Sequence, residues 1–204
     1  MSKFIVFEGG EGVGKSTQLE YFRDYLAKTN QKAVFTREPG GTPLAEKIRH
    51  LILTEEMSAE CEALLFAAAR AEHINNFIKP NLEAGNIVVC DRYIDSSIVY
   101  QGYARDLGEE KVLTYNMYAV NNCMPDAVIF LDMDPLHSFR RRLGAVVEND
   151  RMEREKDDFH SMVYAAYKES ARKYDRFICV EPDDDREVTA RKIVEVLREK
   201  GLID

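Results

Sequence analysis

A glycine-rich segment near the start of the chain has the residue types that hold phosphate groups. Residues 9–16 have the spacing G-x-x-x-x-G-K-S and follow an apolar run at residues 3–8. Glycines allow a backbone that wraps an anion, so that successive N–H groups point into one concavity. Lys15 has the reach to place its charge on the β- and γ-phosphates, and the Ser16 hydroxyl suits a Mg²⁺ ligand. The pattern predicts nucleotide binding; an ordinary glycine-rich turn between a strand and a helix is the alternative.

Charged residues also stand at the ends of later apolar runs. They are Glu8, Arg37, Glu38, Asp91, Arg92 and Asp132. Because parallel strands end at one edge of a sheet, these side chains are expected to gather where ligands bind. We interpret Asp91 as the carboxylate that organises Mg²⁺ and Arg92 as a forked donor to a phosphate. Asp132 is the rival for the metal, and a structural hydrogen bond at a strand end is its other reading.

The elements that must position these residues are short apolar runs alternating with longer amphipathic segments. The predicted strands are residues 3–8, 33–37, 86–91, 127–133 and 177–180. The predicted helices are residues 15–29, 43–53, 58–83, 109–122, 135–143, 157–174 and 186–199. Alternation of this kind predicts an α/β fold with a doubly wound, five-stranded parallel sheet. We expect a single domain over residues 1–204, with a polar lid at about residues 143–158.

Composition excludes several classes of protein. With 45% hydrophobic and 31% charged residues, the 204-residue chain suits a globular domain with a sizeable core. It has no apolar stretch of about 20 residues and no signal-peptide pattern, so we expect a cytoplasmic protein with no membrane partner. The four cysteines form no C-x-x-C pair, which favours reduced thiols. A net charge of −8 disfavours nucleic acid as a partner.

One predicted helix, at residues 58–83, carries an aromatic ring and a forked donor on the same face. Phe66 and Arg70 are four residues apart, and residues at this spacing are neighbours on a helix surface. A pyrimidine ring would be held by such a pair. On sequence alone, a place in the core is the commoner outcome for Phe66.

Five blocks together resemble the thymidylate kinase family. They are residues 7–17, 37–42, 64–73, 91–102 and 150–153, which contain FEGGEGVGKST, REPGGT, LLFAAARAEH, DRYIDSS with YQG, and DRME. The resemblance covers nearly the whole chain, in order and at fitting spacings. The first block is generic, whereas the second to fourth in combination are highly specific. The family implies a P-loop nucleoside monophosphate kinase fold, Mg²⁺, ATP and dTMP as ligands, and a homodimer.

The resemblance also implies roles for individual residues. Phe66 stacks on thymine, Arg70 donates to its O4, and Ser97 and Gln101 lie near the base. Arg37, Arg49 and Arg92 face the substrate phosphate, beside Pro39 in a monophosphate-binding region at about residues 37–75. Tyr100 crowds the sugar 2′ position, Glu11 lies near the 3′-hydroxyl, and Tyr167 closes over the nucleotide. ATP is held by Gly9, Gly10, Glu11, Gly12, Val13, Gly14, Lys15, Ser16 and Thr17, with Arg141 from the lid side.

The chain departs from some members of this family at two positions. Gly12 stands where some members carry an arginine, and those members lack catalytic arginines in the lid. Here the arginines lie in and before the predicted lid, at Arg140, Arg141, Arg142, Arg151 and Arg154, and we take Arg151 as the catalytic one. Ala69 replaces an aspartate that many members have before the arginine.

The expected reaction is transfer of the γ-phosphoryl group of ATP to dTMP, giving dTDP and ADP. The catalytic set is Lys15, Asp91, Arg92 and Arg151, with Ser16 and Asp91 on the metal. A kinase for another nucleoside monophosphate or a deoxynucleoside is the alternative. A GTP-dependent switch protein would need D-x-x-G and N-K-x-D motifs, and the sequence contains neither.

Overall fold

The computed structural model describes residues 2–142 and 157–204, and the side chains of residues 139–142 and 157 lie outside the description. Its centre is a parallel sheet of five strands in the order β2-β3-β1-β4-β5. The strands are β1 (Phe4–Glu8), β2 (Ala33–Arg37), β3 (Ile87–Asp91), β4 (Ala127–Leu131) and β5 (Phe177–Val180). This confirms the predicted five-stranded parallel sheet.

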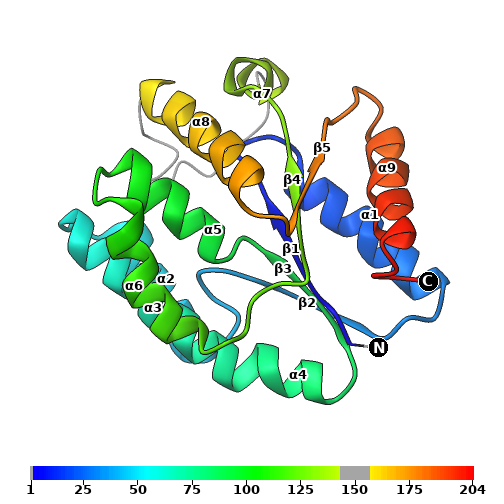
Figure 1. The fold of residues 1–204 in the computed structure, drawn as a ribbon, viewed down its shortest axis with the longest axis horizontal. Helices are drawn as coiled ribbons and strands as arrows, with labels where there is room; N and C mark the ends of the chain where they lie inside the picture. Colours follow the sequence, from blue (N-terminus) through cyan, green and yellow to red (C-terminus); the bar gives the residue numbers. More distant parts are fainter. Residues whose placement is uncertain (1, 143–156) are drawn as a thin grey trace.

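Helices cover both faces of the sheet. Helices α1 and α9 pack on one face, and the helices from α3 to α6, with α8, pack on the other (Figure 1). The helices are α1 (Lys15–Lys28), α2 (Pro43–Thr54), α3 (Ala59–His73), α4 (Lys79–Glu83), α5 (Ile94–Ser97), α6 (Glu109–Val120), α7 (Pro135–Arg142), α8 (Asp157–Lys173) and α9 (Arg186–Glu199). Two π-helical segments, η1 (Ile74–Ile78) and η2 (Ile98–Ala104), continue α3 and α5.

The strands are apolar throughout because each of their faces is covered. In β1, Ile5 and Phe7 pack in the cluster under α1 and α9, whereas Phe4 and Val6 pack in the cluster on the opposite face. A third cluster, which includes Phe130 of β4, lies beneath α8 and η2. Alternate side chains of one strand thus anchor helices on both sides of the sheet.

The helical stretch from α5 through η2 was not predicted. It begins three residues after β3, and most of its residues are buried. A run of buried residues has no polar face, so its sequence lacks the amphipathic period that identifies a helix. The predicted helix at residues 58–83 is present, but the π-helical segment η1 interrupts it.

Helix starts agree with their capping residues. Thr42 accepts a hydrogen bond from the N–H of Ala45 at the start of α2, and Pro43 occupies the first turn. Ser58 accepts from the N–H of Cys61 at the start of α3. These caps fix the beginnings of two helices that contribute residues to the site.

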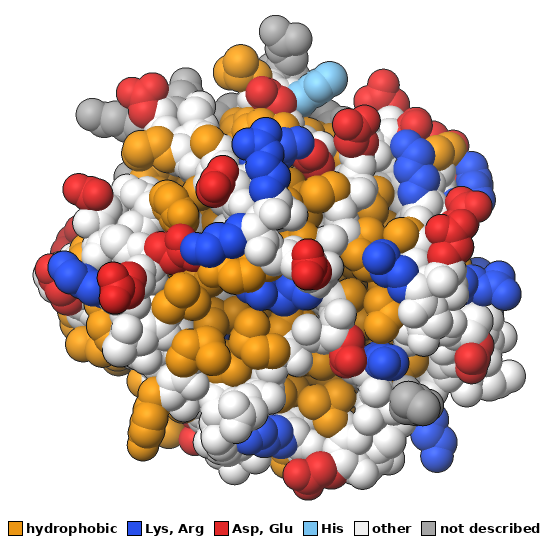
Figure 2. All heavy atoms as spheres, in the orientation of Figure 1, with side chains coloured by type: hydrophobic (Ala, Val, Ile, Leu, Met, Phe, Trp, Pro, Cys, Tyr) orange, Lys and Arg blue, Asp and Glu red, His pale blue; other side chains and the backbone are white. Residues whose placement is uncertain are grey.

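The surface in Figure 2 shows acidic and basic side chains interspersed over the face seen. Among the described residues, no helix combines the length and apolar character that crossing a bilayer requires. All four cysteines are free thiols.

Candidate active site

A cavity of about 520 Å³ opens where β1, β2 and β3 end. Its wall on the side of the phosphate loop contains Glu11, Gly12, Gly14, Lys15, Ser16 and Thr17. The remaining lining residues are Arg37, Glu38, Pro39, Arg49, Leu53, Phe66, Asp91, Arg92, Ser96, Tyr100 and Gln101. The cavity therefore joins four of the five sequence blocks at one edge of the sheet, as the strand-end charges predicted.

Backbone carbonyls of the loop between β1 and α1 hold the side chain of Lys15. Gly14 is the residue before α1 and has φ of 96°, a left-handed conformation that glycine adopts without a side-chain clash. The ammonium of Lys15 donates to the carbonyls of Gly9 at 3.2 Å and Gly10 at 3.0 Å. Burial lowers the pKa of Lys15, and the charge of Arg92 acts in the same direction. The side chain of Lys15 is thus held by two carbonyls of the phosphate loop.

An ion pair crosses the cavity between the phosphate loop and β3. Arg92 Nη2 donates to Glu11 Oε1 at 2.6 Å, and the Tyr100 hydroxyl donates to the same oxygen at 3.0 Å. Burial acts to raise the pKa of Glu11, but Arg92, Lys15 and the Tyr100 hydrogen bond outweigh it and lower the pKa to about 2. Glu11 is therefore ionised at neutral pH.

Arg92 is also held from the side away from Glu11. Its Nη1 donates to Ser96 Oγ at 3.2 Å and to the Tyr167 hydroxyl at 3.3 Å. Glu8 completes this group, because its Oε2 accepts from the Tyr167 hydroxyl at 2.7 Å and its Oε1 from the Ser96 N–H at 3.1 Å. Burial raises the pKa of Glu8, against the effect of Arg92. Ser96 was missed by the sequence reading, although it belongs to the quoted D-R-Y-I-D-S-S block.

Tyr167 lies behind the cavity wall. The resemblance implied a tyrosine that closes over the nucleotide, but Tyr167 is fully buried and lines no part of the cavity. Its ring stacks on Phe130 with centroids 5.2 Å apart. The apolar cluster beneath α8 takes up the ring, so only the hydroxyl reaches toward Arg92.

Asp91 and Asp132, the two candidate metal ligands, have different surroundings. Asp91 Oδ1 is buried and has no hydrogen-bond partner among the described residues, and Asp91 lines the cavity together with Ser16. Asp132 instead accepts from the Tyr164 hydroxyl at 2.9 Å and from the Lys168 ammonium. An unpartnered buried carboxylate oxygen in the same cavity as the Ser16 hydroxyl would suit Mg²⁺, which prefers oxygen ligands. The hydrogen bonds of Asp132 agree with the alternative that this carboxylate has a structural role at a strand end.

Arginines and a proline form the wall expected to face a monophosphate. Arg37 donates from Nη2 to both oxygens of Glu46, at 3.1 and 2.9 Å. Arg49 Nη1 donates to the carbonyl of Pro39 at 3.1 Å. All three predicted residues line the cavity.

The wall expected to hold the base is formed by α3 and η2. Phe66 lines the cavity and belongs to none of the three core clusters, so the core reading of this ring is not supported. Gln101 also lines the cavity, and its Nε2 donates to buried Glu62 at 2.8 Å. Arg70 and Ser97 are buried just behind this wall and are joined by a 3.1 Å hydrogen bond from Arg70 Nη1.

Other predicted site residues lie outside the cavity or outside the description. Val13 is buried in the core cluster under α1, and Gly9 and Gly10 contribute the carbonyls that accept from Lys15. The side chains of Arg141 and Arg151, and nearly all of the predicted lid at residues 143–158, lie outside the described part of the chain.

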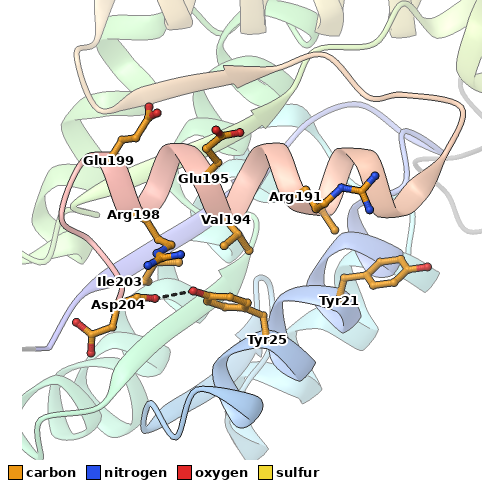
Figure 3. A pocket seen from close by; sticks show the side chains of 10 residues that line it. Tyr21, Tyr25, Arg191, Val194, Glu195, Arg198, Glu199, Ile203 and Asp204 are labelled. Carbon is orange, nitrogen blue, oxygen red and sulfur yellow. Dashed lines mark hydrogen bonds between the residues drawn. The ribbon is translucent and has the colours of Figure 1, made fainter.

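A separate groove of about 840 Å³ lies between α1 and α9. Tyr21 and Tyr25 project from α1 toward the charged side chains of α9, and the Tyr25 hydroxyl donates to the main-chain oxygen of Asp204 at 2.6 Å (Figure 3). The groove contains no residue of the phosphate loop. The Tyr25 hydrogen bond attaches Asp204 to α1.

Comparisons with known proteins agree with the geometry. The family model for thymidylate kinase matches residues 7–193. The thymidylate kinase of Finegoldia magna is 41% identical over 203 residues, covering 98% of this chain and all of that protein. That of Halothermothrix orenii is 45% identical and covers 93% of each chain. That of Symbiobacterium thermophilum is 47% identical, over 84% of this chain and 81% of its own. With the phosphate loop, the Asp91-Arg92 strand end and the aromatic wall in one cavity, these matches place the chain in the thymidylate kinase family.

Proposed function

We propose that this protein transfers the γ-phosphoryl group of ATP to dTMP, giving dTDP and ADP. The observation that carries the proposal is the shared cavity, in which the phosphate loop faces a wall made of Phe66, Tyr100 and Gln101. The phosphates of a nucleoside triphosphate at Lys15 and of a nucleoside monophosphate against that wall would meet at Arg92. Relatives named thymidylate kinase over nearly the whole chain support the same substrate pair.

The transfer requires positioning and charge neutralisation more than proton transfer. The acceptor is already a phosphate anion, so no strong general base is needed. Lys15 supplies a positive charge at the phosphate loop, and Arg92, fixed at both of its terminal nitrogens, is positioned to hold the phosphate oxygens of the acceptor. Ser16 and Asp91 would hold Mg²⁺, which neutralises charge on the phosphates when it is bound.

The surrounding residues have distinct roles in this proposal. Phe66 stacks on thymine, Arg70 addresses its O4, and Tyr100 occupies the space that a ribose 2′-hydroxyl would need. Arg37 and Arg49 hold the phosphate of the monophosphate. Glu11, which is paired with Arg92 and Tyr100, would accept a hydrogen bond from the sugar 3′-hydroxyl.

Arg151 from the lid and Arg141 from the helix before it belong to the proposal as further donors. With Gly12 lacking a side chain, the charge that develops on the transferring phosphoryl needs a cation from elsewhere in the chain. The arginine-rich segment around the lid supplies candidates.

We also propose a cytoplasmic homodimer. Free thiols at all four cysteines fit a reducing compartment. Three neighbouring helices, α2, α3 and α6, expose large apolar side chains, namely Leu44, Leu51, Leu64, Met117 and Tyr118. Such side chains favour a subunit interface, and sedimentation velocity at several concentrations would give the stoichiometry.

Product analysis tests the reaction itself. Purified protein is incubated with ATP, MgCl₂ and dTMP, and the nucleotides are separated by anion-exchange chromatography. We expect equal amounts of dTDP and ADP, and little ADP when dTMP is omitted. ADP and inorganic phosphate formed equally with and without dTMP would contradict the proposal and favour a nucleotide hydrolase.

A further inference from the structure

Buried polar side chains join the end of β2 to helix α3 behind the cavity wall. Glu38 Oε2 accepts from Arg70 Nε at 2.8 Å, and Glu38 Oε1 pairs with His73 Nδ1 at 3.0 Å. The second ring nitrogen of His73 lies 2.7 Å from Thr36 Oγ1. The side chains of Arg70 and His73 are 1% and 0% exposed. Each oxygen of the Glu38 carboxylate is therefore held by a side chain of α3.

The same network fixes the guanidinium group of Arg70. Its Nη1 donates to Ser97 Oγ at 3.1 Å and also to Asn116 Oδ1. The Asn116 amide is itself oriented, because its Nδ2 donates to the carbonyl of Val112 at 2.8 Å. Among the described residues, Nη2 of Arg70 makes no hydrogen bond. The described side chains therefore hold the guanidinium through Nε and Nη1.

His73 also packs directly beneath the turn that follows Pro39. A Cβ built on Gly41 would lie 2.4 Å from His73 Nε2 and 2.5 Å from Thr36 Oγ1, and Gly41 has φ of +83°. Only glycine is compatible with so close an approach of backbone and ring. The imidazole therefore sits between the turn of the proposed phosphate wall and the helix of the proposed base wall.

We propose that His73 is a positioning residue for base selection. Its Nδ1–H fixes the Glu38 carboxylate, and Glu38 in turn orients Arg70 toward the 4-position of the pyrimidine. The proposal rests on the proposed function, in which Arg70 distinguishes the carbonyl of thymine from the amine of cytosine. If the Nδ1 donor is lost, one oxygen of a buried carboxylate is left unsatisfied, and the shared hydrogen bond to Arg70 shifts with it. An Arg70 guanidinium that is held less firmly discriminates less well between thymine and cytosine.

Two substitutions separate the two nitrogens of the ring. In His73→Asn the amide nitrogen occupies roughly the position of Nδ1 and can still donate to Glu38. In His73→Gln the amide reaches the position of Nε2 near Thr36, and the donor to Glu38 is lost. The selectivity is the kcat/KM for dTMP divided by the kcat/KM for dCMP. We expect His73→Gln to lower this ratio by ~10-fold or more, mainly through a higher KM for dTMP. We expect His73→Asn to keep the ratio within about threefold of the unmodified enzyme.

Controls make the result specific to the network. His50→Asn changes an exposed histidine of α2 and should leave the ratio unchanged. Thermal unfolding followed by circular dichroism gives the stability of each variant. Glu38→Gln, which keeps the shape of the side chain but removes one acceptor, provides a second route if His73→Gln does not fold. It should narrow the ratio by a similar factor.

The outcomes distinguish this inference from the proposed function. If His73→Gln or Glu38→Gln lowers the melting temperature but keeps the selectivity of the unmodified enzyme, the network is only structural and the inference is wrong. Equal loss of selectivity in His73→Asn and His73→Gln would also overturn it, because the Nδ1 donor would then not be the active feature. An unmodified enzyme that does not phosphorylate dTMP would overturn the proposed function itself, together with the inference.

Discussion

Arg92 and Glu11 form a 2.6 Å ion pair that links the end of β3 to the phosphate loop. The arginine has φ of 66°, so a non-glycine residue is held in the left-handed region at the centre of the site. Its backbone N–H donates to the carbonyl of Phe7 at 2.9 Å, which ties this conformation to the adjacent strand. The pair therefore ties the phosphate loop to the end of β3, and its loss should lower the stability of the fold.

The Glu11–Arg92 pair predicts a particular pH dependence of stability. The folded-state pKa of Glu11 is about 2, below the ordinary value of 4.5. A lowered folded pKa contributes stability above the unfolded pKa, and this stability is lost as the pH falls toward the folded pKa. Urea unfolding at about pH 6 and about pH 3.5 should show the difference in unfolding free energy between the unmodified protein and Glu11→Gln shrinking by about 1.4 kcal/mol. A difference that stays constant over this range would show that Glu11 has an ordinary pKa.

Lys15→Ala should remove most of the activity without unfolding the protein. Among the described residues that line the cavity Lys15 is the one lysine, and two carbonyls of the loop hold its ammonium group. We expect kcat to fall on the order of 10³-fold or more, as for loss of a charged transition-state contact. Lys28→Ala, at the exposed end of the same helix, is the matched control. An alanine variant at position 15 with more than about a tenth of normal activity would exclude the loop from the mechanism.

Exchanging each of two carboxylates for an amide compares the rival metal ligands. Asp91→Asn should raise the MgCl₂ concentration needed for half-maximal activity by ~10-fold or more, because a neutral amide is a weaker ligand for a hard cation. Asp132→Asn should leave that concentration unchanged, since Asp132 is already held by Tyr164 and Lys168. The reverse pattern would transfer the metal role to Asp132. Activity titrated with MgCl₂ at fixed ATP gives both values.

Tyr100 provides a test of sugar selectivity with two variants. Its ring lines the cavity and its hydroxyl donates to Glu11. Tyr100→Ala should narrow the preference for dTMP over its ribonucleotide analogue by ~10-fold, because space opens beside the 2′ position. Tyr100→Phe keeps the ring and should keep the preference for dTMP, although it removes the hydrogen bond to Glu11. Equal discrimination in the alanine variant and the unmodified enzyme would assign the ring to packing alone.

The sequence predicted those parts of the molecule that depend on local patterns. Apolar runs located all five strands, and the motif spacing located Lys15, Asp91 and Arg92 at one edge of the sheet. The segment from Ile94 to Ala104 was missed because its side chains are mostly buried, which removes the amphipathic period.

Contacts between distant segments could not be predicted in this way. Glu38 and Arg70 are separated by 32 residues and Glu8 and Tyr167 by 159. No spacing rule connects such residues, and their pairing depends on the packing of α3 and α8 against the sheet. For the same reason the burial of Tyr167 behind Arg92 was not foreseen.

The most direct test is the rate of ADP release across a panel of nucleoside monophosphates. The 5-methyl group of thymine is a single methyl in the cavity, so dUMP should have a kcat/KM roughly tenfold below that of dTMP. Cytosine presents an amine to the donor of Arg70, so dCMP should fall by ~10³-fold or more. Purine monophosphates should be poorer still, because their ring system is larger than that of a pyrimidine. dTMP as the best acceptor, in that order, is the predicted result; another monophosphate accepted as well as or better than dTMP would contradict the account.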